Sequence, residues 1–222
     1  MIQCPICNSP QNDKQPESGL HCFTTIFNCG CKITNNFKSQ DFIYEQRCDE
    51  PIKINSIDTI FNPTTLKLVY AQETLNALIP KSIFLAGPSP RDKETVSWRN
   101  EAIDIFMDID FKGTILIPEL RDTFSNTFEY DKQINWEEMA LKKASIILFW
   151  IPRELEKLPG FTTNIEWGYW VAKAPDKLVL GAPDNAPKMD YINYYANKLS
   201  VPKHNNLKDT IIAALDKLNE IK

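Results

Sequence analysis

Two carboxylates in the sequence stand beside aromatic residues, a combination that suits chemistry on a flat, polar substrate. Glu166 precedes Trp167 in the segment 161–170, FTTNIEWGYW, and Glu137 follows Trp136. An aromatic ring can stack on a heterocycle, while a carboxylate accepts hydrogen bonds from its amino or imino groups. The alternative is a structural role, with each carboxylate near a helix N-terminus and each tryptophan in the core.

A loop with a glycine and an arginine, GPSPR, follows the apolar run SIFLA at residues 82–86. Gly87 lets the backbone approach a ligand, Arg91 can bind a phosphate or carboxylate, and Ser89 adds a hydrogen-bonding group. The loop leads into a predicted helix, whose N-terminus favours anions. The loop alone is also compatible with an ordinary turn and a solvated arginine, and the sequence has no Walker or G-x-G-x-x-G motif.

Short apolar runs alternate with amphipathic segments from residue 81 onward, and this pattern predicts the elements that position these side chains. Four runs are predicted to be buried strands, and Ser97 is expected to cap the helix after the first of them; the runs are SIFLAGP, GTILIPE, SIILFWIP and KLVLGAP. The alternation predicts an α/β, flavodoxin- or Rossmann-like doubly wound parallel sheet with helices on both faces. Ligands bind such sheets beyond the carboxyl ends of the strands.

The composition changes sharply along the chain, because all six cysteines lie in the first 48 residues. We therefore expect residues 1–48 to form a zinc-ribbon-like module and residues 81–222 to form the α/β domain. Residues 49–80 are expected to be a connector that contains a short strand in LKLVY.

The cysteine spacing predicts one structural zinc ion, since a Cys-x2-Cys pair presents two thiolates to a tetrahedral metal and four thiolates leave no open position for catalysis. The expected ligands are Cys4, Cys7, Cys29 and Cys31. Cys22 or His21 is the alternative for the fourth position, because the later pair has the shorter Cys-x-Cys spacing. The other interpretation is a set of unpaired, buried cysteines without a metal.

The charge and hydropathy of the chain exclude some classes of partner. The formal net charge is −4 over 222 residues, which disfavours a nucleic-acid polymer as the main partner. No apolar run approaches the roughly 20 residues of a membrane span, and the polar N-terminal segment has no signal-peptide core. We expect a cytoplasmic protein without membrane contact.

Four segments in this order resemble the nucleoside 2-deoxyribosyltransferases, and in particular a divergent branch with a GP-x-PR loop and an FWIPR strand end. They are IFLAGP, the acidic aromatic helix, SIILFWIP and NIEWGYWVAKAPDKLVLG, and they cover about residues 81–190. The most specific match is Glu166-Trp167-Gly168-Tyr169, which is similar to the family's nucleophile segment. The resemblance implies that Glu166 attacks the C1′ atom of a bound nucleoside or nucleotide, and Gly168 is expected to allow close packing on the sheet.

The sequence departs from the family pattern at two positions. Family members have an aspartate that assists the leaving base about six residues before the nucleophile, but that position lies near Gly160 here. We expect Glu137 to take over base recognition. Phe84 stands where many members have a tyrosine that orients the nucleophile, and Asn164 or Tyr130 could replace its hydroxyl group.

The resemblance implies cleavage or transfer at the N-glycosidic bond of a nucleoside or nucleoside 5′-monophosphate, since related hydrolases of monophosphates place a serine and an arginine where Ser89 and Arg91 stand. Trp98 and Arg99 could extend that site. Two alternatives remain: a nucleotide-binding sensor of the same fold without catalysis, and an NAD-cleaving glycohydrolase. Family members often complete the site across subunits, so the resemblance also implies a homo-oligomer.

Overall fold

The computed structural model describes residues 63–76, 79–92, 94–121 and 129–221, together with four strands nearer the N-terminus. The chain divides into two compact units, one of residues 1–62 and 73–79 and the other of residues 63–72 and 80–222. The first unit holds an antiparallel sheet in the order β1-β2-β3-β4, with bounds Ser18–Gly19, Cys22–Ile26, Lys32–Asn36 and Phe42–Glu45. The expected zinc ligands lie outside the described residues; they are Cys4, Cys7, Cys29 and Cys31.

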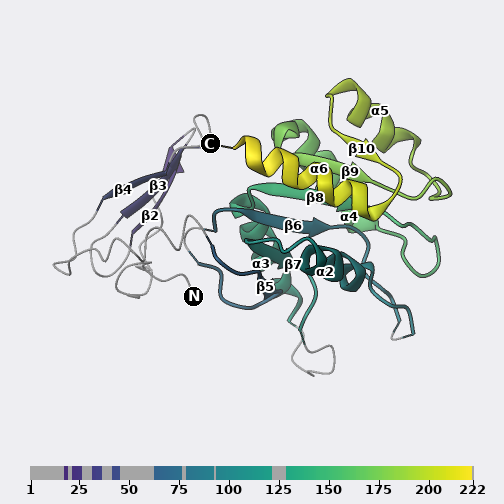
Figure 1. Ribbon diagram of the computed structural model, residues 1–222, viewed down its shortest axis with the longest axis horizontal. Coiled ribbons are helices and arrows are strands. Elements are labelled where there is room, and N and C mark those ends of the chain that lie inside the picture. The colour runs from purple at the N-terminus through teal and green to yellow at the C-terminus, as the bar shows by residue number, and fades with distance from the viewer. Residues whose placement is uncertain are drawn as a thin grey trace. The chain divides into compact units, whose positions relative to one another are not determined.

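The second unit is built on a six-stranded sheet in which every neighbouring pair is parallel, in the order β10-β9-β8-β6-β7-β5 (Figure 1). The strands are β5 (Lys67–Tyr70), β6 (Ser82–Ala86), β7 (Thr114–Ile117), β8 (Ile146–Trp150), β9 (Leu178–Gly181) and β10 (Lys203–His204). The predicted α/β fold with a parallel, Rossmann-like sheet is confirmed. The strand expected in LKLVY is β5, which pairs with β7 and so extends this sheet on the N-terminal side of residue 81.

The helices of the second unit connect the strands in chain order. They are α2 (Trp98–Asp108), α3 (Tyr130–Lys143), α4 (Phe161–Lys173), α5 (Asp190–Lys198) and α6 (Leu207–Glu220), with the short 3-10 helix η1 (Pro175–Lys177) before β9. The chain after β6 passes through α2 to β7 on one side, and β8 lies on the other side of β6. The order of strands therefore reverses between β6 and β8, where doubly wound sheets form their ligand crevice.

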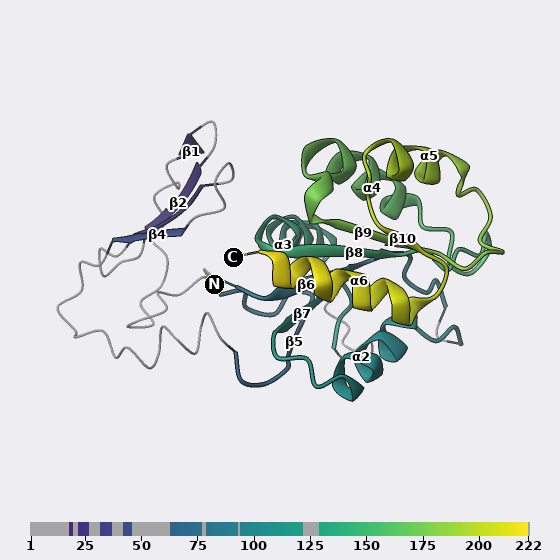
Figure 2. The same cartoon turned by 45° about the horizontal axis from the view of Figure 1, so that its top comes forward.

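The alternation of side chains along β6 divides the helices between the two faces of the sheet. Ile83 and Leu85 belong to a buried cluster that also contains Trp98 of α2 and Leu207 of α6. Phe84 points the other way, toward Trp136 of α3. Figure 2 shows α2 and α6 on one face of the sheet and α3, α4 and α5 on the other.

The four central strands, β6 to β9, are mostly apolar because both of their faces are covered, as expected for a parallel sheet with helices on both sides. All residues of β6, β7, β8 and β9 are buried. Ser97 caps α2, as predicted, because its side-chain oxygen accepts a hydrogen bond from the backbone N–H of Arg99. Within the described parts of the chain, no helix has the length and apolar character needed to span a membrane.

Candidate active site

The loop after β6 passes directly against the end of β8, and this approach requires a glycine. A Cβ atom at Gly87 would lie 2.1 Å from the carbonyl oxygen of Trp150 and 2.9 Å from the ring of Trp98, and the φ angle of Gly87 is +153°. An L-residue with a side chain would meet both a steric and a conformational penalty here. Gly87 therefore brings the backbone of this loop to the crevice between β6 and β8.

Arg99, in the first turn of α2, holds the loop in place. Its side chain is only 1 % exposed. The guanidinium donates to the carbonyl oxygens of Leu85, Gly87 and Pro88, at 3.1, 2.9 and 3.4 Å, and to Ser89 Oγ at 3.2 Å. One buried cation thus satisfies four acceptors along the loop, which a planar guanidinium with five donors can do and a lysine cannot.

The same guanidinium forms an ion pair with Glu119, which follows β7. Arg99 Nη1 lies 2.6 Å from Glu119 Oε1, and Ser97 Oγ donates to that oxygen at 2.9 Å. The carboxylate therefore neutralises most of the buried charge. The loops after β6 and β7 and the start of α2 are joined by this network, which stays rigid because each buried polar group has a partner.

Glu137 extends from α3 and lies beyond the end of β7. It is the eighth residue of a helix that begins at Tyr130, and not a first-turn residue as the sequence suggested, so it is not placed to stabilise the helix dipole. Its Oε1 accepts a hydrogen bond of 2.7 Å from Gln133, which also donates to the carbonyl oxygen of Pro118 at 3.2 Å. Burial raises the pKa of Glu137, and the Gln133 hydrogen bond and the charge of Arg99 oppose that rise.

Glu166 lies in the second turn of α4, the helix that follows β8. The pKa of Glu166 is raised to about 8, chiefly by burial; the negative charge of Glu137 contributes to the rise, and the positive charge of Arg99 opposes it. Electrostatic influence of this kind requires the three charged groups to lie near one another. The structure therefore brings Glu137, Glu166 and Arg99 together at the carboxyl ends of the central strands.

With the pKa of Glu166 raised to about 8 by burial and by the charge of Glu137, the pair of carboxylates binds a proton at neutral pH. One of the pair can then act as a nucleophile or base while the other supplies a proton. This division of roles is the one that glycosidic bond cleavage requires. It arises because burial and like charge both disfavour the state in which Glu137 and Glu166 are ionised together.

The aromatic residues expected to contact the substrate are in the core. Trp136 is 3 % exposed, and its ring centroid lies 6.4 Å from that of the fully buried Phe84. Both rings lie between α3 and the sheet. Their positions agree with the structural alternative for Trp136, and neither ring presents a face to solvent in this structure.

Ser89 and Arg91 are exposed at the edge of the crevice. The Arg91 guanidinium lies 5.3 Å from the ring centroid of Phe161, the first residue of α4. The loops after β6 and β8 adjoin, since the backbone N–H of Arg91 donates to the carbonyl oxygen of Lys157 at 3.3 Å. Arg91 is thereby placed beside the N-terminus of α4, a position that suits binding of an anion.

Two residues of the sequence motif face away from the two carboxylates. Asn164 Oδ1 accepts a hydrogen bond from Arg153, on the side of α4 that faces α5, so Asn164 is not beside Glu166. Gly168 does not pack on the sheet, because a Cβ atom there would meet nothing within 4 Å. Two residues along a helix are separated by about 200°, which explains why Asn164 and Glu166 point to opposite sides.

Sequence reasoning missed Glu119 and Gln133, and it gave Arg99 a role only as an extension of the loop. Glu119 stands two residues beyond β7, at a strand end of the kind that lines such crevices. Gln133 stands four residues before Glu137 on a helix, the spacing at which side chains meet. Both signals were present in the sequence, but neither distinguishes a contact from a solvated side chain.

Among the residues that the structure describes, no group of three His, Cys, Asp or Glu side chains could hold a metal ion. No curated protein matches the chain. Residues 80–185 match the model of the family described as nucleoside 2-deoxyribosyltransferase like. The stretch that carries β6, β8 and both carboxylates is therefore similar to a family associated with glycosyl transfer or cleavage on nucleosides.

Proposed function

We propose that the protein cleaves or transfers the N-glycosidic bond of a nucleoside or nucleoside 5′-monophosphate. The observation that carries this proposal is the pair of carboxylates at the switch point of the sheet, where Glu137 raises the pKa of Glu166. The match of residues 80–185 to the deoxyribosyltransferase-like family supports it independently.

In the proposed reaction Glu166 is the nucleophile, and the reactive form of the pair is the singly protonated one in which the proton has moved from Glu166 to Glu137. Its carboxylate oxygen forms a bond to C1′ as the bond from C1′ to the base nitrogen breaks, and the electron pair stays on the base. The base takes a proton from the Glu137 carboxyl group. Water or a second base then attacks C1′ and gives its proton to the Glu137 carboxylate, and the ester to Glu166 breaks.

Recognition of a 5′-phosphate is assigned to Arg91 and Ser89. Both are exposed at the rim, and Arg91 lies against Phe161 at the N-terminus of α4, where backbone N–H groups favour an anion. None of the ion pairs among the described residues uses Arg91. Its guanidinium is therefore available for a phosphate group.

A homo-oligomer is part of the proposal, because large apolar side chains are exposed on the two helices that carry the carboxylates. They are Tyr130 and Ile134 of α3 and Phe161, Ile165 and Tyr169 of α4. On each helix they recur at a spacing of four residues and so form a stripe. Contiguous apolar stripes of this kind are typical of interfaces, and a second copy would cover them.

A structural zinc ion in the first unit is also proposed. Cys29 and Cys31 stand in the sequence between β2 and β3, which pair antiparallel, and Cys4 and Cys7 precede β1. A knuckle between two antiparallel strands is the usual setting for one pair of zinc-ribbon thiolates. The zinc would stabilise the small unit and take no part in the reaction.

The test is chromatography of free bases after the protein is incubated with a panel of nucleosides, 5′-monophosphates and NAD. Base release by the wild type and not by Glu166→Gln supports the proposal, and dependence on an added acceptor base separates transfer from hydrolysis. Release from NAD alone would favour the glycohydrolase. If no compound loses its base, the protein is a binding module and the catalytic proposal is wrong.

A further inference from the structure

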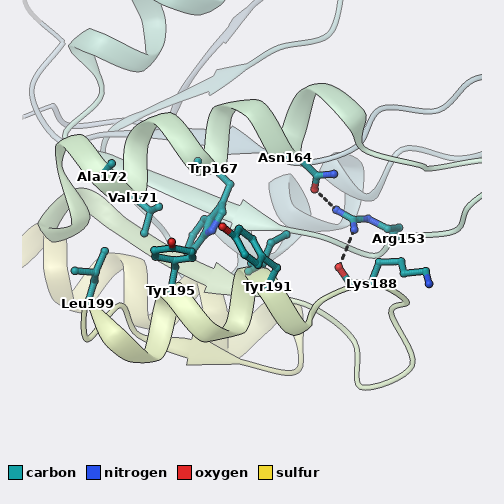
Figure 3. Close-up of a pocket in the computed structure, with 11 residues that line it drawn as sticks. Arg153, Asn164, Trp167, Val171, Ala172, Lys188, Tyr191, Tyr195 and Leu199 are labelled. Atoms are coloured by element: carbon teal, nitrogen blue, oxygen red, sulfur yellow. Dashed lines mark hydrogen bonds between the residues drawn. The ribbon is translucent and has the colours of Figure 1, made fainter.

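A groove of about 550 Å³ lies between α4 and α5 (Figure 3). Its volume falls within the range of small-molecule sites, about 300–1,000 Å³. Its walls are mostly apolar and aromatic, and one end carries two cations, Arg153 and Lys188. The sequence did not predict the groove, although it named one of its lining residues, Asn164, as a candidate for the reaction site.

The groove is separate from the candidate active site, although both use α4. Asn164, Trp167, Gly168 and Val171 line it, and their spacing of three and four residues places them on one side of the helix. Glu166 is not among the lining residues and is influenced by Glu137 of α3. One side of α4 therefore lines the groove, and the opposite side carries Glu166 in the candidate active site.

A buried cation at one end of the groove has no anionic partner among the described residues. Arg153 is 5 % exposed, and its guanidinium donates to Asn164 Oδ1 at 2.5 Å and to the carbonyl oxygen of Lys188 at 3.1 Å. Neither acceptor carries a charge, and no ion pair in the described part of the chain includes Arg153. Burial lowers the pKa of Arg153. A buried charge without a counter-ion is costly, and an anion beside it would remove that cost.

Two buried donors at the groove also lack acceptors. They are Arg153 Nε and Trp167 Nε1, and Trp167 is 3 % exposed. Most buried donors in proteins are paired, so each exception calls for a partner that is not yet present. Both side chains line the same groove and come from different elements, the strand end after β8 and α4.

The remaining walls suit a flat ring. Tyr191 and Tyr195 of α5 lie edge to face with centroids 5.2 Å apart, and Figure 3 shows them opposite α4, near Trp167. Gly168 leaves open space, since a Cβ atom there would touch nothing within 4 Å. A planar group can thus approach the α4 backbone while aromatic rings contact its faces or edges.

We propose that this groove binds a small molecule that combines a flat ring with an anionic group. The ring lies among Trp167, Tyr191 and Tyr195, and the carboxylate or phosphate lies at Arg153 and Lys188. Aromatic carboxylates and nucleoside monophosphates share this chemistry. The site is independent of the reaction proposed for Glu166, and its test uses no activity measurement.

The test is a titration of the full-length protein with benzoate and, separately, with AMP, followed by the NMR signals of the tryptophan indole N–H groups. Trp167→Phe assigns the signal of interest. We expect the Trp167 signal to shift with at least one probe, because its N–H gains an acceptor or a new ring neighbour. With benzoate the Trp98 signal should stay fixed, since that indole donates to the carbonyl oxygen of Pro88, outside the groove. With AMP, itself a candidate substrate, a shift of the Trp98 signal reports binding at the loop after β6, and only a shift of the Trp167 signal reports the groove. A response to benzoate alone identifies an aromatic carboxylate site, and a response to AMP alone identifies a nucleotide site.

Variants decide whether the shift reports the groove. Gly168→Leu fills the open space and should weaken binding at least tenfold, and Lys188→Ala should weaken it about threefold to tenfold. Lys208→Ala, on α6, serves as a charge-matched control and should change nothing. If Gly168→Leu fails to fold, Tyr191→Ala, at an exposed wall, replaces it. The proposal is overturned if neither probe moves the Trp167 signal, or if binding is unchanged when the groove is filled.

Discussion

Glu137 on α3 lies near enough to Glu166 on α4 for its charge to raise the pKa of Glu166, which burial and this charge together bring to about 8. The two residues are 29 positions apart in the sequence and come from helices that follow different strands. Because Glu137 lies near Glu166 at the switch point of the sheet, the two carboxylates do not ionise independently.

Glu166→Gln should abolish turnover and stabilise the fold. The pKa of Glu166 rises from an ordinary value of 4.5 to about 8 in the native protein, so the native state binds its proton more tightly than the unfolded chain does. Native stability is therefore lost as the pH rises from 4.5 through about 8, and the uncharged glutamine side chain of the variant would not incur that loss. We expect a gain of several kcal/mol at pH 9, with an upper bound of about 5 kcal/mol set by a shift from 4.5 to about 8 at roughly 1.4 kcal/mol per pKa unit, and little gain at pH 4.

Urea unfolding of both proteins at pH 4, 7 and 9 measures this difference. Glu138→Gln is the control, because Glu138 is exposed and pairs with Lys142 at 2.6 Å on the surface of α3. Equal pH dependence in wild type and Glu166→Gln would show that Glu166 titrates normally.

The value of kcat/KM should fall as the pH rises through about 8. The reactive form has one ionised carboxylate to attack C1′ and one protonated carboxyl group for the leaving base, and the second ionisation removes it. Glu137→Gln should slow substrates with poor leaving bases most. It should also lower the pKa of Glu166, because a like charge is removed.

A pH series with wild type, Glu137→Gln and Glu138→Gln provides the measurement. A rate that increases through pH 8 in the wild type would mean that the pair acts in its fully ionised form, and Glu137 would lose its role as the acid.

Arg99→Met should destabilise the protein by about 3–5 kcal/mol, as expected when one member of a buried ion pair is removed. The carbonyl oxygens of Leu85 and Gly87 would lose the Arg99 donor, and the carboxylate of Glu119 would keep only the hydrogen bond from Ser97. Arg91→Met removes an exposed arginine of the same loop and should change stability by no more than about 0.5 kcal/mol. Chemical denaturation compares the two, and equal small effects would contradict the role assigned to Arg99.

Ile165→Glu should convert an oligomer into a monomer without unfolding it. Ile165 is 74 % exposed on α4, so a charge there costs little in the single chain but disrupts an apolar contact between copies. Ile212→Glu, at an exposed isoleucine of α6 on the other face of the sheet, is the control. Sedimentation velocity measures the oligomeric state of the wild type and both variants. If the wild type sediments as a monomer, the proposed homo-oligomer is wrong.

Cys7→Ser should lower the zinc content of the purified protein and the stability of the first unit. Each structural thiolate contributes to folding of a zinc ribbon, so loss of one ligand weakens metal binding strongly. Cys48→Ser changes a cysteine outside the expected ligand set and should leave the zinc content intact. Metal analysis decides the matter, and a wild type that contains no zinc after gentle purification excludes the metal.

Local patterns in the sequence were sufficient to predict the alternation of strands and helices, the Ser97 cap and the strand ends that line the crevice. Hydrophobic runs, helical periodicity and capping residues involve only a few neighbouring positions, so they can be recognised in the sequence without knowledge of the tertiary structure. The position of Glu166 on a helix after a strand followed from the same patterns.

The tertiary structure alone decided which side chains meet. In the folded protein Trp136 is buried against Phe84, and Asn164 accepts a hydrogen bond from Arg153. The loop after β6 is held by hydrogen bonds from Arg99 and not from Arg91. It also opened the groove beside Gly168. These contacts depend on how α3, α4 and α5 pack on the sheet. A contact between two distant segments does not change the hydrophobic periodicity of either segment, so the sequence pattern does not predict it.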